Sequence, residues 1–490
     1  MAFGAVALML IDAFQDEEGG LAMPAALVHF VAGSTALLLW KRGLPLDSGL
    51  LHGYLVIDKT SLFLDAVIGL GGGLASLLAG GYLHEHKLER GEYYPLLGFA
   101  SCGAMMLVSA SDTLMLFVAL ETMSLGVYAM TGYRRTSARA LEAALKYFLL
   151  GSFAAALLLA GAALLYTVTG HTDFAGIAQA LHPTGEQPPD PFLVDKARIS
   201  ILAMLLILAA LAFKVGAVPF HMWVPDTYEG APTSTTAYMS VVVKTAAFGV
   251  FLRLMLTVFG DAGSASSAAG WPALMAWVAV LTMTVGNLAA LVQTSVKRML
   301  AYSSIAHAGY LLVGVVLAPR GGGVGAVAVA SVLFYLLAYT VSNVGAFGAL
   351  MLAGRRGAEA VSFDDLAGLG KRHPWAAFAL TFFLLSLTGV PPTAGFFGKF
   401  YIVRTALDSG LGLLAAIVVV NSAVSAYYYL GVIVKMFMKD PAPGATRAQP
   451  MASGTIFFTL VGAALGVLYL GLLPERVLSL ALAAAERAAP

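Results

Sequence analysis

Long apolar runs, separated by short charged or Gly/Pro-rich connections, restrict the fold of this chain more than any other feature. A bilayer core offers no water to backbone groups, so only helices and closed barrels cross it, and a helix needs about 20 apolar residues. The runs therefore predict an all-α polytopic membrane protein with about 14 transmembrane helices. The predicted spans are 1–15, 23–40, 61–83, 93–110, 112–132, 140–168, 199–219, 231–258, 271–293, 299–318, 324–353, 374–407, 411–438 and 453–473.

Composition agrees with this fold class and narrows the function. Hydrophobic residues make up 59% of the chain, charged residues 11%, and the mean hydropathy is +0.84, all outside the soluble globular range. The formal charge of +1 and the lack of basic clusters exclude a nucleic-acid partner. The single cysteine, Cys102, excludes an intramolecular disulfide and a Cys-ligated iron–sulfur centre. No nucleotide, haem or flavin motif stands out, so we expect no cofactor and no metal in this chain.

Lysines and arginines in the connections favour one orientation of the chain. With Lys146, Lys214, Lys244 and Lys399 set aside and the N-terminus placed outside, the inside connections hold 14 of the remaining 24 Lys and Arg residues. This bias predicts that both termini are periplasmic. The longest connections, 169–198 and 354–373, are too short for a soluble domain, so residues 1–490 are predicted to form a single transmembrane domain.

Ionisable residues inside the apolar runs are the candidates for function. A lysine at the centre of a bilayer costs roughly 2.5–3.5 kcal/mol, and such residues are tolerated where they face a protein interior or a water-filled path. One mid-membrane glutamate against several lysines leaves most of these lysines without a carboxylate partner, which favours reversible protonation over static ion pairs. The candidates are Glu121, Lys146, Lys214, Lys244, His307 and Lys399.

Two of these candidates have an alternative reading. Lys146 follows Glu142 by four positions, so it either joins the path or pairs with Glu142 near the start of its helix. His307 shares a helix face with Ser303 and Tyr310, and is either a relay between Lys244 and Lys399 or a satisfied core histidine. Similarly spaced polar side chains occur on two later spans, where they either extend the relay or form hydrogen bonds between helices. The repeated sets are Tyr335, Tyr339 and Ser342, and Asn421, Ser425 and Tyr428.

Two lysines lie beside predicted helix breaks. Pro219 follows Lys214 by five residues, and Pro391 and Pro392 precede Lys399 within the run 374–407. A proline inside a helix leaves a backbone carbonyl without its donor and breaks or kinks the helix. Broken helices at corresponding places in two halves of a chain are typical of transporters built from inverted repeats.

Five stretches together resemble the subunit N family of bacterial NADH-quinone oxidoreductase, respiratory complex I, whose mitochondrial counterpart is NADH dehydrogenase subunit 2. They are FKVGAVPFHMWVPDTYEGAPTSTTAYMSVVVKTAAFGVFLR at 213–253, LETMSLGVYAMTGY at 120–133, ALKYFLLGSFAAALLLAGAALLY at 144–166, AYSSIAHAGYLLVG at 301–314 and LSLTGVPPTAGFFGKFYI at 385–402. The resemblance implies fourteen transmembrane helices with two inverted five-helix repeats and broken helices 7 and 12. It divides the chain into N-terminal helices at 1–92, repeats at 93–258 and 271–438, and a last helix at 453–473.

The resemblance also implies roles for the candidate residues. By position, Glu121 is the family's fifth-helix glutamate, and the family lysines of helices six, seven, eight and twelve are Lys146, Lys214, Lys244 and Lys399. These groups, with His307, are implied to translocate protons, driven by quinone reduction elsewhere in the complex. NADH, FMN, iron–sulfur clusters and quinone are then bound by other subunits, and this chain carries out no redox chemistry.

The implied partners are lipid and other membrane-arm subunits, namely antiporter-like subunit M and the small subunits K and J, in a bacterial inner (plasma) membrane. Lysine at position 399 indicates that the chain is not subunit M itself. The seventeen residues after the last span are too few for the long lateral helix of subunit L. Two alternatives stay open. One is a cation/proton antiporter subunit that exchanges sodium or potassium for protons, and the other is a purely structural scaffold.

Overall fold

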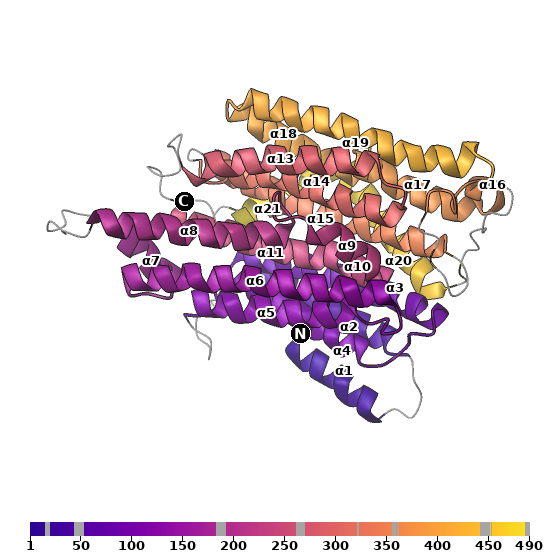
Figure 1. The fold of residues 1–490 in the computed structure, drawn as a ribbon, viewed down its shortest axis with the longest axis horizontal. Helices are drawn as coiled ribbons and strands as arrows, with labels where there is room; N and C mark the ends of the chain where they lie inside the picture. Colours follow the sequence, from indigo (N-terminus) through magenta and orange to yellow (C-terminus); the bar gives the residue numbers. More distant parts are fainter. Residues whose placement is uncertain are drawn as a thin grey trace.

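The computed structural model describes residues 1–14, 20–43, 53–182, 193–260, 270–320, 323–354, 359, 362–441, 451 and 453–485. These residues form helices and no strand, with a few isolated β-bridges. The long helices lie roughly parallel, with α1 (Ala2–Phe14) at the bottom of Figure 1 and α18 (Ala394–Asp408) and α19 (Gly412–Met438) at the top. Arg355, Arg356 and Arg447, which count in the predicted orientation, lie outside the described residues.

The helices follow the predicted apolar runs closely. They are α1 (Ala2–Phe14), α2 (Ala22–Arg42), α3 (Lys59–Glu85), α4 (Tyr93–Ser109), α5 (Thr113–Thr131), α6 (Ala138–Thr169), α7 (Phe174–Leu181), α8 (Leu193–Val215), α9 (Trp223–Gly230), α10 (Thr233–Tyr238), the π-helix η1 (Met239–Val243), α11 (Lys244–Phe259), α13 (Trp271–Leu291), α14 (Val296–Leu317), α15 (Val324–Leu352), α16 (Leu369–Arg372), α17 (Pro374–Thr388), α18 (Ala394–Asp408), α19 (Gly412–Met438), α20 (Gly454–Leu472) and α21 (Pro474–Ala485).

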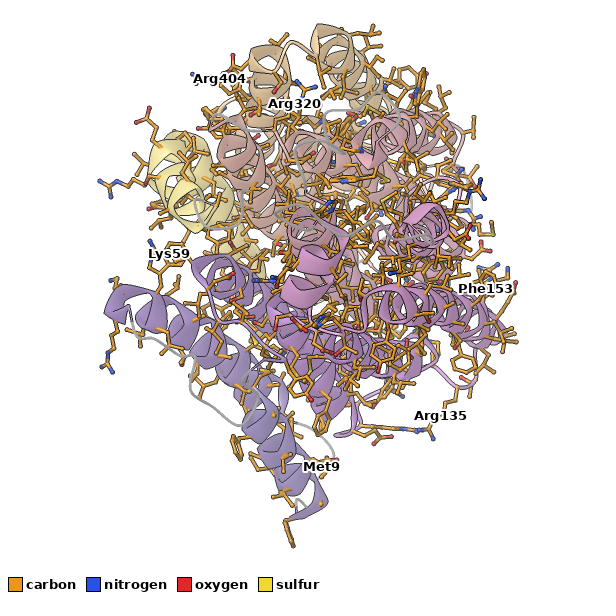
Figure 2. The ribbon with its side chains drawn as sticks, turned by 90° about the vertical axis from the view of Figure 1, so that its left-hand side faces the viewer. Met9, Lys59, Arg135, Phe153, Arg320 and Arg404 are labelled. Carbon is orange, nitrogen blue, oxygen red and sulfur yellow. The ribbon has the colours of Figure 1, made fainter. Side chains whose placement is uncertain are left out.

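Within the described residues, eleven helices are long and apolar enough to cross a membrane. Three shorter apolar helices, α1, α4 and α17, accompany them. The protein is therefore an all-helical, membrane-embedded chain. Figure 2 looks along the helices, and there Phe153 of α6 points outward from the bundle, where the residue is 63% exposed. Such exposed apolar side chains at the periphery suit contact with lipid.

The boundary between α4 and α5 is as predicted. The sequence places a break at Asp112, and this residue is the N-cap of α5, where its carboxylate accepts a hydrogen bond from the backbone N–H of Leu114 at 2.7 Å. An N-cap carboxylate satisfies backbone donors that have no partner within the helix. This explains why an acidic residue marks the helix start so sharply.

Several short helices were not predicted. α7 and α16 lie in connections, and α21 follows the last predicted span, where the sequence suggested only a short tail. The α21 residues Val477 and Ala481 are buried, and Thr60 of α3 donates a hydrogen bond to the backbone carbonyl of Ala484 at 2.8 Å. α21 has too few apolar residues to form a span and packs through one face only, so hydropathy alone did not reveal it.

Two helices end where the sequence places a glycine before a proline. α8 ends at Val215, and the next residue, Gly216, has φ +75°. α17 ends at Thr388, and its C-cap Gly389 has φ +90°. Glycine tolerates this left-handed conformation, and a proline shortly afterwards prevents the helix from continuing. The chain resumes helical structure at α9 and α18, so the backbone is non-helical beside Lys214 and before Lys399.

The most enclosed of the long helices are α14, the segment α10–η1–α11, α15 and α3, and they form the centre of the bundle. α15 packs against α3, α14, α17, α18, α20 and α21. α14 packs against α9, α13, α15 and α18. Polar side chains on α11, α14 and α15 therefore face protein and not lipid.

Candidate functional site

Lys214, at the end of α8, lies in a pocket of aromatic and hydroxyl groups. Its side chain is buried, and the ammonium donates a hydrogen bond to the Ser124 hydroxyl of α5 at 2.7 Å. The rings of Tyr128 and Tyr147 each lie 5.8 Å from the lysine nitrogen. Aromatic faces stabilise a desolvated cation at this range without a carboxylate.

Glu121 lies one turn before Ser124 on the same helix, and the structure leaves it half-buried. Its Oε1 atom is buried and has no hydrogen-bond partner within the described part of the chain. The ion pairs found among the described residues include none between Glu121 and Lys214. The glutamate therefore lies near the lysine without holding it, and Ser124 takes the contact instead.

The break after Lys214 is bridged by Trp223 of α9. Its indole N–H donates a hydrogen bond to the backbone carbonyl of Phe213 at 2.9 Å. The same indole stacks on Tyr147, with ring centres 4.5 Å apart and planes 10° apart. α9 is thus fixed to the carbonyl next to Lys214 and to one of the rings that surround this lysine.

Lys244 begins α11 directly after the π-helical segment η1, and it is also buried. It donates hydrogen bonds to both the backbone carbonyl and the hydroxyl of Ser304 on α14. Its nitrogen lies 5.1 Å from the ring of Tyr339 on α15. π-Helical turns are frequent at functional sites, where they redirect a side chain.

A small internal cavity lies between the two lysines. It has a volume of about 10 Å³, and its lining includes Lys214, Lys244, Tyr228 and Ser304. A cavity of about 10–15 Å³ holds one water molecule when two or more polar groups surround it. The structure therefore brings Lys214 and Lys244 to one polar space.

His307 lies beyond Lys244 on α14. Its Nδ1 is 2.7 Å from the Tyr335 hydroxyl, and its Nε2 is 3.2 Å from the Tyr429 hydroxyl. The ring centre lies 5.0 Å from that of Tyr339 and 5.7 Å from that of Tyr310. Both ring nitrogens are satisfied, so the contacts fit a core histidine and also connect the surroundings of Lys244 with those of Lys399.

Lys399 is on α18, just after the second break, and it is buried. It donates hydrogen bonds to the backbone carbonyl of Thr388 at 2.8 Å and to the Ser422 hydroxyl at 3.0 Å. The Tyr310 ring centre lies 5.3 Å from its nitrogen. Thr388 is the last residue of α17, and the carbonyl end of a helix favours a cation.

The predicted polar set Asn421, Ser425 and Tyr428 lies beside the contacts that lead from His307 to Lys399. Tyr428 donates a hydrogen bond to the Asn287 side chain of α13 at 3.0 Å, and Asn287 donates to Asn421 at 3.1 Å and to the Tyr310 hydroxyl at 2.9 Å. Ser425 donates to the Ser422 carbonyl. These bonds join α13, α14 and α19, and they orient Tyr310 between His307 and Lys399.

Lys146 lies apart from the buried set. Its side chain is 44% exposed, and its ammonium lies 2.7 Å from Glu142 and 2.8 Å from Asp226. The structure thus contains the pair with Glu142 that the sequence allowed and adds a second carboxylate, Asp226 of α9. Burial alone would raise the pKa of Asp226, but hydrogen bonds from Lys146 and Arg298 lower it overall.

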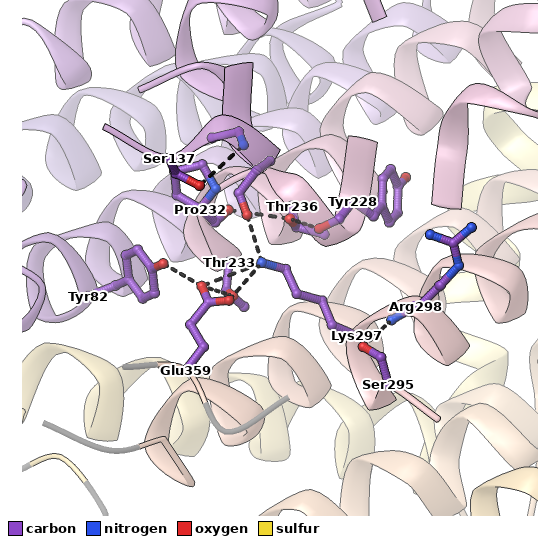
Figure 3. Close-up of polar contacts among 12 residues, drawn as sticks. Tyr82, Ser137, Tyr228, Pro232, Thr233, Thr236, Ser295, Lys297, Arg298 and Glu359 are labelled. Atoms are coloured by element: carbon purple, nitrogen blue, oxygen red, sulfur yellow. Dashed lines mark hydrogen bonds and ion pairs between the residues drawn. The ribbon is translucent and has the colours of Figure 1, made fainter. Parts of the chain in front are cut away.

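Sequence reasoning missed one fully buried lysine. Lys297 counted as a basic residue of an inside connection, but only 1% of its side chain is exposed, and it pairs with Glu359 at 3.1 Å. Figure 3 shows Lys297 and Tyr82 converging on the Glu359 carboxylate. Because Lys297 sits in the first turn of α14, next to polar residues, a hydropathy average treats it as part of a loop.

Comparisons with known proteins identify the family of this chain. Residues 110–425 match a family described as NADH:quinone oxidoreductase/Mrp antiporter, TM. A relative from Sorangium cellulosum, named NADH-quinone oxidoreductase subunit N 1, is 59% identical over 88% of this chain and 83% of its own length. The chain belongs to the subunit N family of NADH-quinone oxidoreductase.

Solved structures support the membership of this subunit N chain. A chain of respiratory complex I from Thermus thermophilus is 34% identical, with a TM-score of 0.78 over 98% of this chain and 97% of that one. A chain of the Mrp complex from Dietzia sp. has a TM-score of 0.81 at 22% identity, covering 99% of this chain and 95% of that one. At 22% identity, the second likeness concerns the fold alone.

Proposed function

We propose that this subunit N chain translocates protons across the membrane through Glu121, Lys214, Lys244, His307 and Lys399. The chain acts as a part of NADH-quinone oxidoreductase, a translocase, and contains no redox chemistry of its own. Quinone reduction elsewhere in the complex drives the transfer. NADH, FMN, iron–sulfur clusters and quinone are assigned to other subunits.

The observation that carries the proposal is the cavity shared by Lys214 and Lys244. It offers a polar space in which the ammonium of one lysine can pass a proton to the neutral amine of the other, either directly or through one water molecule. From Lys244 the contacts continue through Tyr339, His307 and Tyr310 to Lys399. None of the three lysines forms an ion pair with a carboxylate among the described residues, so no fixed negative charge holds their protons.

Glu121 supplies the adjustable charge in this scheme. A carboxylate within about 4–6 Å of a lysine favours the protonated form, and a more distant one releases it. With Lys214 bonded to Ser124, the structure corresponds to the state in which the glutamate does not hold the lysine. Movement of Glu121 toward Lys214 would load the lysine with a proton, and its withdrawal would unload it.

The finer architecture belongs to the same proposal. The three shorter apolar helices complete fourteen crossings, and residues 93–258 and 271–438 form two inverted repeats whose broken helices carry Pro219 and Pro391–Pro392. Both termini lie on the periplasmic side of a bacterial inner membrane. Antiporter-like subunit M and the small subunits K and J are the proposed neighbours.

Substitution of Lys214 and Glu121 tests the function. In membrane vesicles that carry the assembled complex, Lys214→Ala and Glu121→Ala should each cut proton pumping and quinone reduction while the amount of complex is unchanged. The amount of complex is measured as NADH oxidation with ferricyanide, which needs the redox arm only. Full pumping in both variants would contradict the proposal and favour a structural scaffold.

The second candidate is a cation/proton antiporter subunit, and the fold likeness to the Mrp complex motivates it. It predicts sodium- or potassium-dependent proton transport, and genes for antiporter subunits beside that of this chain. The higher identity to the complex I chain, at similar coverage, favours the first candidate. Transport that depends on sodium or potassium would reverse this preference.

A further inference from the structure

Two consecutive cations begin α14 and point in different directions. Successive residues on a helix are about 100° apart, so neighbouring side chains leave the helix in different directions. Lys297 extends into the protein, while Arg298 extends along the outside of α9 and is 31% exposed. Figure 3 shows the two side chains leaving the helix in these two directions.

Lys297 holds the junction between α9 and α10. Its ammonium donates a hydrogen bond to the backbone carbonyl of Ala231 at 2.6 Å. It also pairs with Glu359, which in turn accepts a hydrogen bond from Thr233 at 2.7 Å and another from Tyr82. Lys297 therefore contacts the last residues before α10 directly, and the first residue of α10 through Glu359.

Arg298 holds α9 from its other side. One guanidinium nitrogen lies 2.9 Å from Asp226 and 2.9 Å from Glu229, which are three positions apart and so share a face of α9. The Asp226 carboxylate also accepts a hydrogen bond from the Lys146 ammonium of α6 at 2.8 Å. α9 is thus fastened to α14 by Arg298 and to α6 by Lys146.

The fastened segment is the part of the chain that separates the two lysines of the shared cavity. On its N-terminal side, Trp223 bonds to the carbonyl beside Lys214. On its C-terminal side, α10 leads into η1 and Lys244. α14, which carries Lys297 and Arg298, also carries Ser304, the acceptor for Lys244.

Stability alone does not explain the Lys297–Glu359 pair, in which the lysine is buried and the glutamate side chain is 20% exposed. Taking two charges out of water costs about as much as their attraction returns, and replacing such a pair with apolar groups is often neutral or stabilising. The best-attested use of a buried ion pair is to fix one arrangement of the elements that it joins. Here those elements are α14 and the α9–α10 junction.

We propose that Lys297 and Arg298 are positioning residues that clamp the α9–α10 junction onto α14 and thereby set the placement of Lys214 relative to Lys244. The proposal rests on the proposed function, because it explains how the shared cavity keeps its dimensions. The clamp itself carries no proton. Loss of the clamp displaces the two lysines from each other and slows transfer between them.

The test removes the buried charges together. Lys297→Met with Glu359→Gln leaves no unpaired buried charge, and glutamine can still accept from Tyr82 and Thr233. The double variant should therefore assemble like the unaltered protein, with the same thermal stability of the complex. Proton pumping and quinone reduction, each divided by ferricyanide activity, should fall roughly tenfold to a hundredfold, because transfer is sensitive to misplacement by about 1 Å.

A matched control separates positioning from the mere loss of an ion pair. The pair Lys371–Asp440 is exposed, 2.7 Å long and makes no contact with the junction, so Lys371→Met with Asp440→Asn should keep full activity. If Lys297 and Glu359 serve stability only, the charge-free double variant recovers full pumping, and this outcome overturns the proposal. Arg298→Gln gives a second measurement of the clamp with the same expected loss.

The outcome also separates this proposal from the proposed function. Loss of pumping in Lys214→Ala, together with full pumping in both clamp variants, would overturn the clamp and leave the path intact. Full pumping in Lys214→Ala would overturn the path and the clamp together. A loss in the clamp variants that is matched by an equal loss of assembled complex would assign Lys297 and Arg298 to folding and overturn the positioning role.

Discussion

The ammonium of Lys214 donates its hydrogen bond to the hydroxyl of Ser124, 2.7 Å away, and forms no ion pair with Glu121 one turn earlier on α5. Ser124 and Glu121 are three positions apart, so both side chains face the end of α8 that carries Lys214. The lysine therefore has a neutral partner and a charged alternative on the same helix face. This arrangement allows the lysine to exchange partners without any movement of a whole helix.

Removing the neutral partner should weaken transfer at Lys214. Ser124→Ala leaves the buried ammonium without this hydrogen bond, and a bond to a charged group contributes about 1.5–3 kcal/mol. We expect proton pumping per assembled complex to fall roughly tenfold or more, since 1.4 kcal/mol corresponds to a factor of ten. Ser124→Thr retains the hydroxyl and should stay close to the unaltered rate. Equal rates for alanine and threonine would show that Ser124 takes no part.

His307 can be tested against its reading as a core residue. His307→Gln keeps a side chain that can bond to Tyr335 or Tyr429 but cannot exchange a proton near neutral pH. A group that transfers protons contributes roughly a hundredfold to ten-thousandfold, so pumping in this variant should fall by at least a hundredfold. Ser331→Ala, which removes a buried hydroxyl bonded to Thr405, is the control and should pump normally. A glutamine variant that pumps normally would make His307 a core residue.

The fold was largely predictable because hydropathy and helix-ending residues carry most of its information. The apolar runs correspond to helices, and Asp112 separates α4 from α5. Lys214, Lys244 and Lys399 were recognisable because each interrupts an apolar run. Local sequence was sufficient wherever the signal lay within one helix.

The contacts that organise the site were not predictable, since each joins residues far apart in the sequence. In the sequence, Lys297 cannot be told from a lysine in a loop, because its partners come from the packing of α14 against the α9–α10 junction. Trp223 likewise cannot be told from other apolar residues in the sequence, because its stacking on Tyr147 depends on the tertiary fold. Lys146 could be read from the sequence as a partner of Glu142, but not as a partner of Asp226. Partners of this kind depend on tertiary packing.

The clamp should act equally across the neutral pH range. Burial alone would raise the pKa of Glu359, but the charge of Lys297 and hydrogen bonds from Tyr82 and Thr233 lower it from 4.5 to about 2. A lowered carboxyl pKa means that the stabilisation is complete above the ordinary value and is lost only as the pH falls toward the folded value. His86 stacks on Tyr82, and histidine is the nearby residue type whose ordinary pKa lies closest to neutral pH. Burial lowers the pKa of His86.

The ratio of pumping in the Lys297→Met, Glu359→Gln double variant to pumping in the unaltered protein should therefore be constant between about pH 6 and about pH 8. The other charged groups near Lys297 are Arg134 and Glu229. The measurement is the initial rate of vesicle acidification at several pH values. A ratio that changes severalfold across the range would mean that Glu359 titrates there and takes part in proton exchange.

Substitutions of Lys399 distinguish a residue that releases its proton during transfer from one that only supplies a fixed positive charge. Lys399→Arg keeps a cation with donors for the Thr388 carbonyl and the Ser422 hydroxyl, but arginine does not release its proton at any physiological pH. If Lys399 must become neutral in each cycle, this variant should pump as little as Lys399→Met. Both should fall roughly a hundredfold or more below the unaltered protein, which is the usual contribution of proton transfer. If Lys399 only stabilises the end of α17, arginine should preserve pumping and methionine should not. Lys371→Arg at the exposed pair with Asp440 controls for the substitution itself and should pump normally.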